Sequence, residues 1–101
     1  MSYLEYSGLL SKISQRLDQL NQHEQLLFMC RRHIASRPEN IPNALSLLRE
    51  LEEQNNLAID QVELLKDILR GVEEWSLIQK VRKFEEKRKE YNELLDRKSV
   101  V

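Results

Sequence analysis

Leucine and isoleucine recur at intervals of three and four residues in several separate stretches of this chain, and that spacing limits the folds open to it. In the first stretch the series is Leu9, Leu10, Ile13, Leu17 and Leu20. Because an α-helix turns once in about 3.6 residues, such a series places the apolar side chains on one helical face. Helices with one apolar face must bury those faces against each other, so we expect them to share a single core.

The spacing predicts six helices with short connections, at approximately residues 3–19, 22–35, 42–54, 61–70, 73–82 and 84–97. The prolines of "SRPENIP" and the turn signal "NNL" separate the second, third and fourth helices. Gly71 suits the left-handed residue that often ends a helix. No glycine or proline separates the fifth helix from the sixth, so a single long helix remains an alternative there.

Glycine and proline are scarce, with two of each among 101 residues. Folds built from β-strands need frequent turns, and turns favour these residues, so the scarcity indicates an all-α protein. We therefore expect a six-helix antiparallel bundle. The length fits one domain, which we place at residues 1–98, with residues 99–101 as a frayed tail.

The charged residues nearly cancel in number but are unevenly distributed. The formal net charge is −1, yet residues 50–74 hold eight acids against two bases, and residues 80–98 hold eight bases against five acids. A near-neutral chain does not favour nucleic acid or a membrane as partner, and no apolar run approaches the roughly 18 residues of a membrane span. We expect no secretory signal peptide and a cytoplasmic location, with the nucleus as an alternative.

Residues that commonly carry chemistry are sparse. The single cysteine, Cys30, lies three residues before His33, but no third group completes a nucleophilic site. With His23, these residues would supply at most three metal ligands, so we expect no metal centre. No glycine-rich loop indicates a phosphate or nucleotide site. We therefore predict a protein that is not an enzyme and needs no cofactor, with Cys30 in its core.

The stretch "QLLFMCRRHI", residues 25–34, contains one apolar residue that does not fit the buried face of its helix. At about 100° per residue, Leu26 and Cys30 cluster on one side of the helix, and Phe28 lies nearly opposite them. Arg31 and Arg32 flank that outer face. An exposed aromatic ring beside arginines has the composition of an interface hot spot. The alternative is that the first helix or a tail covers Phe28 and makes it part of the core.

Four stretches of the sequence, taken in order and spacing, resemble the helices of one known family. They are "YSGLLSKISQRL", "LLFMC", "NALSLLRELEEQNNL" and "DQVELLKDILRGV", and they are similar to that family's first, second, third and fourth helices. The family that they resemble is the death effector domain family, a branch of the six-helix death fold. The resemblance covers nearly all of the chain.

The resemblance implies assembly with other proteins. Members of the family assemble head-to-tail into filaments that recruit initiator procaspases in death-receptor signalling. An exposed Phe-Leu pair on the second helix docks into a groove of a neighbouring domain, and Phe28 and Met29 match it by position. The family's charge triad is altered here, since its acid in the second helix corresponds to Gln22. Its Arg-x-Asp-Leu motif reads "EWSL", with Glu74 and Ser76 in place of the arginine and the aspartate.

These observations lead to one expected function and two alternatives. We expect a domain for homotypic or heterotypic death-effector-domain assembly in apoptosis or related signalling, of the adaptor or procaspase-prodomain type. Besides Phe28 and Met29, the expected contact residues are the basic Arg31, Arg32 and residues 80–89, and the acidic Glu50, Glu52, Glu53, Glu63 and Asp67. One alternative is a monomeric regulatory module, which the altered triad favours. The other is a helical scaffold or coiled-coil subunit.

Overall fold

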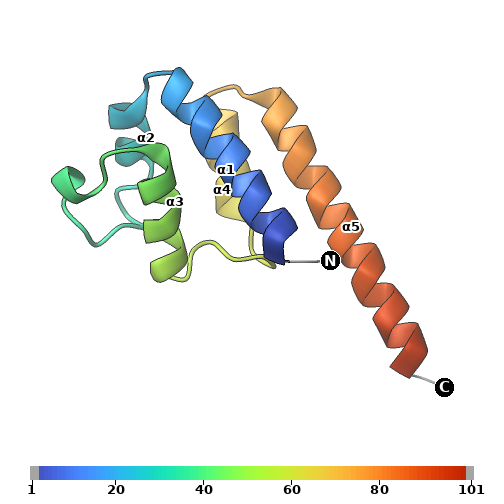
Figure 1. Cartoon of the computed structure of the whole chain (residues 1–101). Coiled ribbons are helices and arrows are strands. Elements are labelled where there is room, and N and C mark those ends of the chain that lie inside the picture. The colour runs from blue at the N-terminus through green and yellow to red at the C-terminus, as the bar shows by residue number, and fades with distance from the viewer. Residues whose placement is uncertain (1–2, 100–101) are drawn as a thin grey trace.

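All regular secondary structure is helical in the part of the chain that the structure describes. The computed structural model describes the backbone of residues 3–99 and the side chains of residues 3–90. The elements are α1 (Tyr3–Gln19), α2 (His23–Met29), the short 3-10 helix η1 (Pro38–Asn40), α3 (Ala44–Glu53), α4 (Glu63–Gly71) and α5 (Trp75–Ser99). Figure 1 shows α5 running antiparallel to α1, with its C-terminal half projecting past the other helices.

The expected number of six helices is wrong for the described residues, which contain five α-helices. The expected fifth and sixth helices form the single helix α5, because no glycine or proline interrupts the chain between them. Ser99 still belongs to α5, whereas residues 100 and 101 of the expected tail lie outside the described residues. The side chains of residues 91–99, on the last turns of α5, also lie outside the described part of the chain.

The second helix is shorter than expected and ends at Met29 instead of near residue 35. After Met29 the chain forms turns, in which the backbone amides of Arg31 and His33 donate to the carbonyl oxygens of Phe28 and Cys30. These bonds span three residues and therefore tighten the backbone away from the α-helical pattern. The turns place Arg31 directly beside the last turn of α2.

One continuous core holds the bundle together, and each helix contributes its apolar stripe to it. Leu48 on α3, Leu69 on α4 and Val81 on α5 are completely buried, as is Ile13 on α1. Burying one leucine side chain contributes roughly 1.5–3 kcal/mol relative to leaving it in water. The one-sided leucine spacing of the sequence is therefore the pattern that forms the core.

Two polar contacts fix α1 against α3. The buried Tyr6 hydroxyl donates to the Glu52 carboxylate at 3.0 Å, and burial together with this carboxylate raises the pKa of Tyr6. At the other end of α1, Asp18 accepts a hydrogen bond from the backbone amide of Ala44, the first residue of α3. A carboxylate satisfies the free amides and the dipole at a helix N-terminus, so these contacts set how α3 lies on α1.

A lysine joins α4 to α5 beside the core. Lys66 is mostly buried, and its ammonium group lies 2.7 Å from a Glu85 carboxylate oxygen and 3.0 Å from one of Glu63. The hydrogen bond to Glu85 raises the pKa of Lys66. Glu63, which was expected to contact a partner, is therefore paired with Lys66 within the chain.

Candidate protein-interaction site

Phe28 lies in the last turn of α2 with its ring in solvent. Its exposed fraction is 64%, which confirms the expected exposure and excludes the alternative that another segment buries it. The Arg31 guanidinium lies over the ring, 4.1 Å from the ring centroid, and also donates to the Phe28 carbonyl oxygen at 2.9 Å. A cation above an exposed aromatic face contributes about 0.5–1 kcal/mol, so Arg31 restricts the ring in its exposed position.

Met29 differs from Phe28 because it is half-buried and packs against the core. A Cβ atom added to Gly71 would lie 2.7 Å from the Met29 sulfur atom, so Gly71 leaves the space that the Met29 side chain fills. Gly71 does not adopt the left-handed conformation expected of it, which Glu73 adopts instead with φ 58°. Met29 therefore packs the end of α2 against the core, and only part of its side chain remains accessible to a partner.

The expected acidic contact surface is not a cluster of free carboxylates. Glu63 is bound by Lys66, and Asp67 is bound by Arg70 at 2.9 Å. Glu52 accepts the hydrogen bond from the Tyr6 hydroxyl. Of the five predicted acids, Glu53 is exposed and has no hydrogen bond or ion pair within the described part of the chain.

The expectation that Glu50 contacts a partner is wrong, because this residue is buried. Its exposed fraction is 6%, and its carboxylate accepts hydrogen bonds from the backbone amides of Ala35 and Ser36, both at 3.0 Å, and from the Ser36 hydroxyl at 3.1 Å. These bonds attach the connection after α2 to α3. The sequence does not reveal that Glu50 binds this connection, because residues 35 and 36 reach Glu50 only in the folded chain.

The Glu50 contacts predict a dependence of stability on pH. The backbone amides of Ala35 and Ser36 hold the pKa of Glu50 below its usual value. Because the folded pKa lies below the unfolded one, Glu50 stabilises the fold above the unfolded value of about 4.3, and the effect is lost as the pH falls toward the folded value. We expect Glu50→Gln to lower the melting temperature at neutral pH and to flatten its decrease in acid.

Thermal unfolding across the acidic pH range measures this effect. Glu53→Gln is the matched control, since it removes the same charge from the exposed side of the same helix, and we expect it to leave the curve nearly unchanged. Equal responses of the two variants would contradict the structural role of Glu50.

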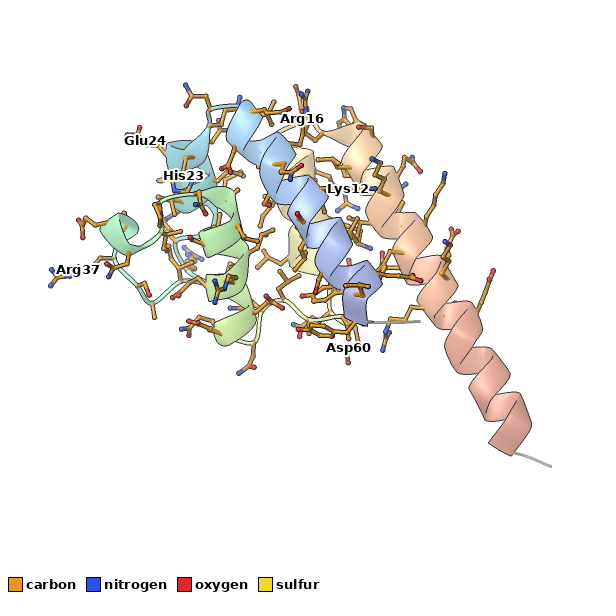
Figure 2. All side chains as sticks on the ribbon, in the orientation of Figure 1. Lys12, Arg16, His23, Glu24, Arg37 and Asp60 are labelled. Carbon is orange, nitrogen blue, oxygen red and sulfur yellow. The ribbon has the colours of Figure 1, made fainter. Side chains whose placement is uncertain are left out.

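The altered triad positions have new surroundings. Glu74 lies before α5, and its carboxylate pairs with Arg16 of α1 at 3.2 Å. Arg16 is labelled near the C-terminal end of α1 in Figure 2. Gln22 is the exposed N-cap residue of α2, and Ser76 is exposed on the first turn of α5. Within the described residues no hydrogen bond joins Gln22 to Glu74 or Ser76, and Glu74 pairs with α1 instead.

Two surface features were missed at the level of sequence. Trp75, the first residue of α5, has an exposed fraction of 60%. The helical period could have revealed it, since Trp75 lies well away from the face that carries Leu77, Ile78 and Val81. The second feature is a groove between α1 and α5, lined by lysines of both helices. No local pattern reveals this groove, because its two sides are far apart in the sequence.

Cys30 and His23 both take part in the packing of the fold. Cys30 is completely buried, as expected, and desolvation raises the pKa of its thiol to about 11. A thiol is a weak nucleophile, so Cys30 serves as a core residue. His23 forms a hydrogen bond with the carbonyl oxygen of Ile41 through its Nε2 atom. Among the residues described, no three side chains of the usual ligand types are placed to hold a metal ion.

The comparisons with known proteins give one match. A family model described as death effector domain matches residues 6–87, which include most of α1, all of α2 to α4 and the first half of α5. Searches of curated proteins and of solved structures found no match. In residues 3–99 none of the helices combines the length and the apolar character needed to cross a membrane. From the extent of the family match, the chain belongs to the death effector domain family.

Proposed function

We propose that this chain binds other death effector domains through the exposed ring of Phe28. Domains of this family are modules for protein–protein interaction. The observation that carries the proposal is the position of Phe28, an apolar side chain that is exposed although Leu26 and Cys30 of the same stretch are buried. Because the ring is already exposed, a partner can bury its apolar surface without any rearrangement of the core.

The surroundings of Phe28 support its use as an anchor. Arg31 restricts the ring before a partner arrives, so less conformational entropy is lost on binding. Aromatic residues and arginine are enriched among the residues that dominate binding energy at interfaces. Arg31 and the exposed Arg32 add positive charge around the ring, so the proposed partner surface is an apolar pocket with carboxylates at its rim.

The contact that we propose is heterologous, because a pocket that accepts Phe28 differs from the surface that presents it. Such contacts lead to rings or to open filaments when each copy carries both surfaces. We place the assembly in apoptotic or related signalling in the cytoplasm, with the nucleus as the second location, and with an adaptor or an initiator procaspase as the partner. Glu53, which remains free on α3, is the acid of this chain that we assign to the opposite side of the contact.

A second candidate function is a monomeric regulatory module that binds one signalling partner. The pair between Arg16 and Glu74 favours it, because Glu74, the charged residue among the triad positions, is paired inside the chain instead of being presented to a neighbour. A charge satisfied within the monomer contributes little to assembly.

Light scattering at rising protein concentration separates the two functions. For the assembling domain we expect growth of the mean particle mass that weakens with added salt, because charges around Phe28 guide the contact. A constant monomer mass over the whole range would support the regulatory module and contradict self-assembly.

A further inference from the structure

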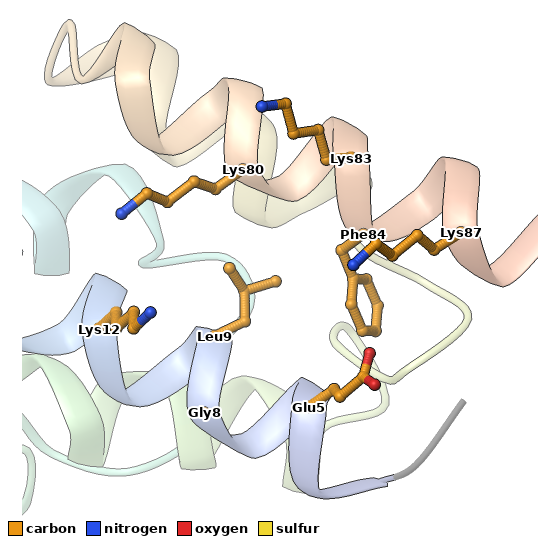
Figure 3. A pocket seen from close by; sticks show the side chains of 8 residues that line it. All are labelled: Glu5, Gly8, Leu9, Lys12, Lys80, Lys83, Phe84 and Lys87. Atoms are coloured by element: carbon orange, nitrogen blue, oxygen red, sulfur yellow. The ribbon is translucent and has the colours of Figure 1, made fainter.

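An open groove of about 510 Å³ runs between α1 and α5, away from Phe28. Its floor is apolar, with Leu9 projecting from α1 toward α5 and Phe84 projecting from α5 toward α1 (Figure 3). Its size lies within the range of roughly 300–1,000 Å³ that is usual for ligand sites in proteins. A smaller, more polar pocket shares Lys12 and Lys80 with this groove, so the depression continues along both helices toward Glu74.

Four lysines surround the apolar floor. Lys12 comes from α1, whereas Lys80, Lys83 and Lys87 follow each other at three- and four-residue spacing on one face of α5. All four are exposed, and within the described residues none of them forms an ion pair. Glu5 is the single acid of the lining. A chain with a net charge of −1 thus concentrates positive potential at one concave site.

The presence of glycine at position 8 is consistent with a binding site in this groove. It lies in the interior of α1, where glycine destabilises a helix relative to alanine or leucine. A Cβ atom added there would meet nothing within 4 Å, so packing within the chain does not require glycine at this position. Its lack of a side chain keeps the floor of the groove open beside Leu9.

We propose that the groove binds an acidic amphipathic helix of a partner protein, with apolar side chains on Leu9 and Phe84 and carboxylates on the lysines. The elongated depression between two helices suits a helical segment, whose apolar residues recur on one face. A flat membrane surface would not reach a concave apolar floor. The Phe28 face of a second copy is also unsuitable, because Arg31 would approach the lysines.

This inference is independent of the function proposed for Phe28, because the two sites use different residues. A phage-displayed library of short peptides, selected on the wild-type chain with counter-selection on Gly8→Leu, identifies what the groove prefers. We expect enrichment of helical peptides that combine leucine or isoleucine with glutamate or aspartate. Absence of such enrichment, or enrichment of neutral or basic peptides, would overturn the proposal.

The selected peptides, labelled with fluorescein, are then titrated with variants in a polarisation assay. Gly8→Leu adds a side chain to the groove at a position where a Cβ atom meets nothing within 4 Å, and Lys80→Glu together with Lys83→Glu reverses the charge of the groove. We expect each change to weaken binding at least about tenfold, with melting temperatures that stay near or above the wild-type value. The matched control is Arg82→Glu with Lys89→Glu, which reverses two charges on the far side of the same helix and should retain binding.

Further measurements exclude the other occupants. Phe28→Ala should leave peptide binding unchanged, which separates this site from the Phe28 contact. The inference fails if Gly8→Leu binds the peptide like wild type, or if the control pair weakens binding as much as the groove pair. It also fails if the groove variants lose self-association in sedimentation, or lose binding to vesicles of phosphatidylserine and phosphatidylcholine, while no peptide binds.

Discussion

Replacing Leu48 by alanine is expected to lower the free energy of unfolding by about 3 kcal/mol, within the usual span of roughly 2–5 kcal/mol for buried leucines. Leu48 is completely buried in the middle of α3, where the side chains of the other helices meet. Its removal takes apolar surface out of the core and leaves a cavity that a close-packed interior fills only in part. Denaturant unfolding monitored by circular dichroism measures the loss.

Leu45→Ala is the matched control for this prediction. Leu45 lies on the same helix, but 45% of its surface is exposed, so we expect a change of at most about 1 kcal/mol. Both variants make the same chemical change, and therefore the difference between them reports burial alone. Similar losses in the two variants would show that α3 presents a different face to the core.

Replacing Phe28 by alanine is expected to weaken the binding of partner death effector domains by at least about 30-fold, which corresponds to roughly 2 kcal/mol. The ring is 64% exposed and contributes little to the core, so the free energy of unfolding should change by less than about 0.5 kcal/mol. Surface plasmon resonance against immobilised partner domains measures the binding, and denaturant unfolding measures the stability.

Two variants serve as controls for the Phe28 prediction. Phe28→Tyr keeps an aromatic ring under Arg31 and should retain most of the binding. Trp75→Ala removes another exposed aromatic side chain, at the start of α5, and should leave this contact intact. A loss of several kcal/mol of stability in Phe28→Ala would identify Phe28 as a core residue and refute its role as an anchor.

The helical fold and its core were predictable because they depend on local periodicity. The spacing of leucines identified α1, α3 and α4, and the same wheel that placed Leu26 and Cys30 inside placed Phe28 outside. The division between the expected fifth and sixth helices failed for an equally local reason. No residue there disfavours helix, and an uninterrupted helix avoids the unpaired backbone groups that two helix ends would leave at that point.

The features that escaped prediction depend on contacts between distant parts of the chain. Glu50 resembles its acidic neighbours in sequence, but the backbone of residues 35 and 36 makes it a buried anchor. Glu63 and Asp67, by contrast, pair with basic residues three positions along α4, a local spacing that is visible in the sequence. The lysine groove requires Lys12 and Lys80 to lie on facing helices, which only the tertiary structure provides.

Our proposal is that this member of the death effector domain family binds related domains through Phe28. Its most direct test is a titration of wild-type and Phe28→Ala chains, in parallel, against the chain itself and a set of death effector domains from adaptors and procaspases. We predict that wild type binds at least one of them and that Phe28→Ala loses this binding while its unfolding curve stays the same. Equal binding by both chains, or no binding by wild type to any of the domains, would contradict the claim.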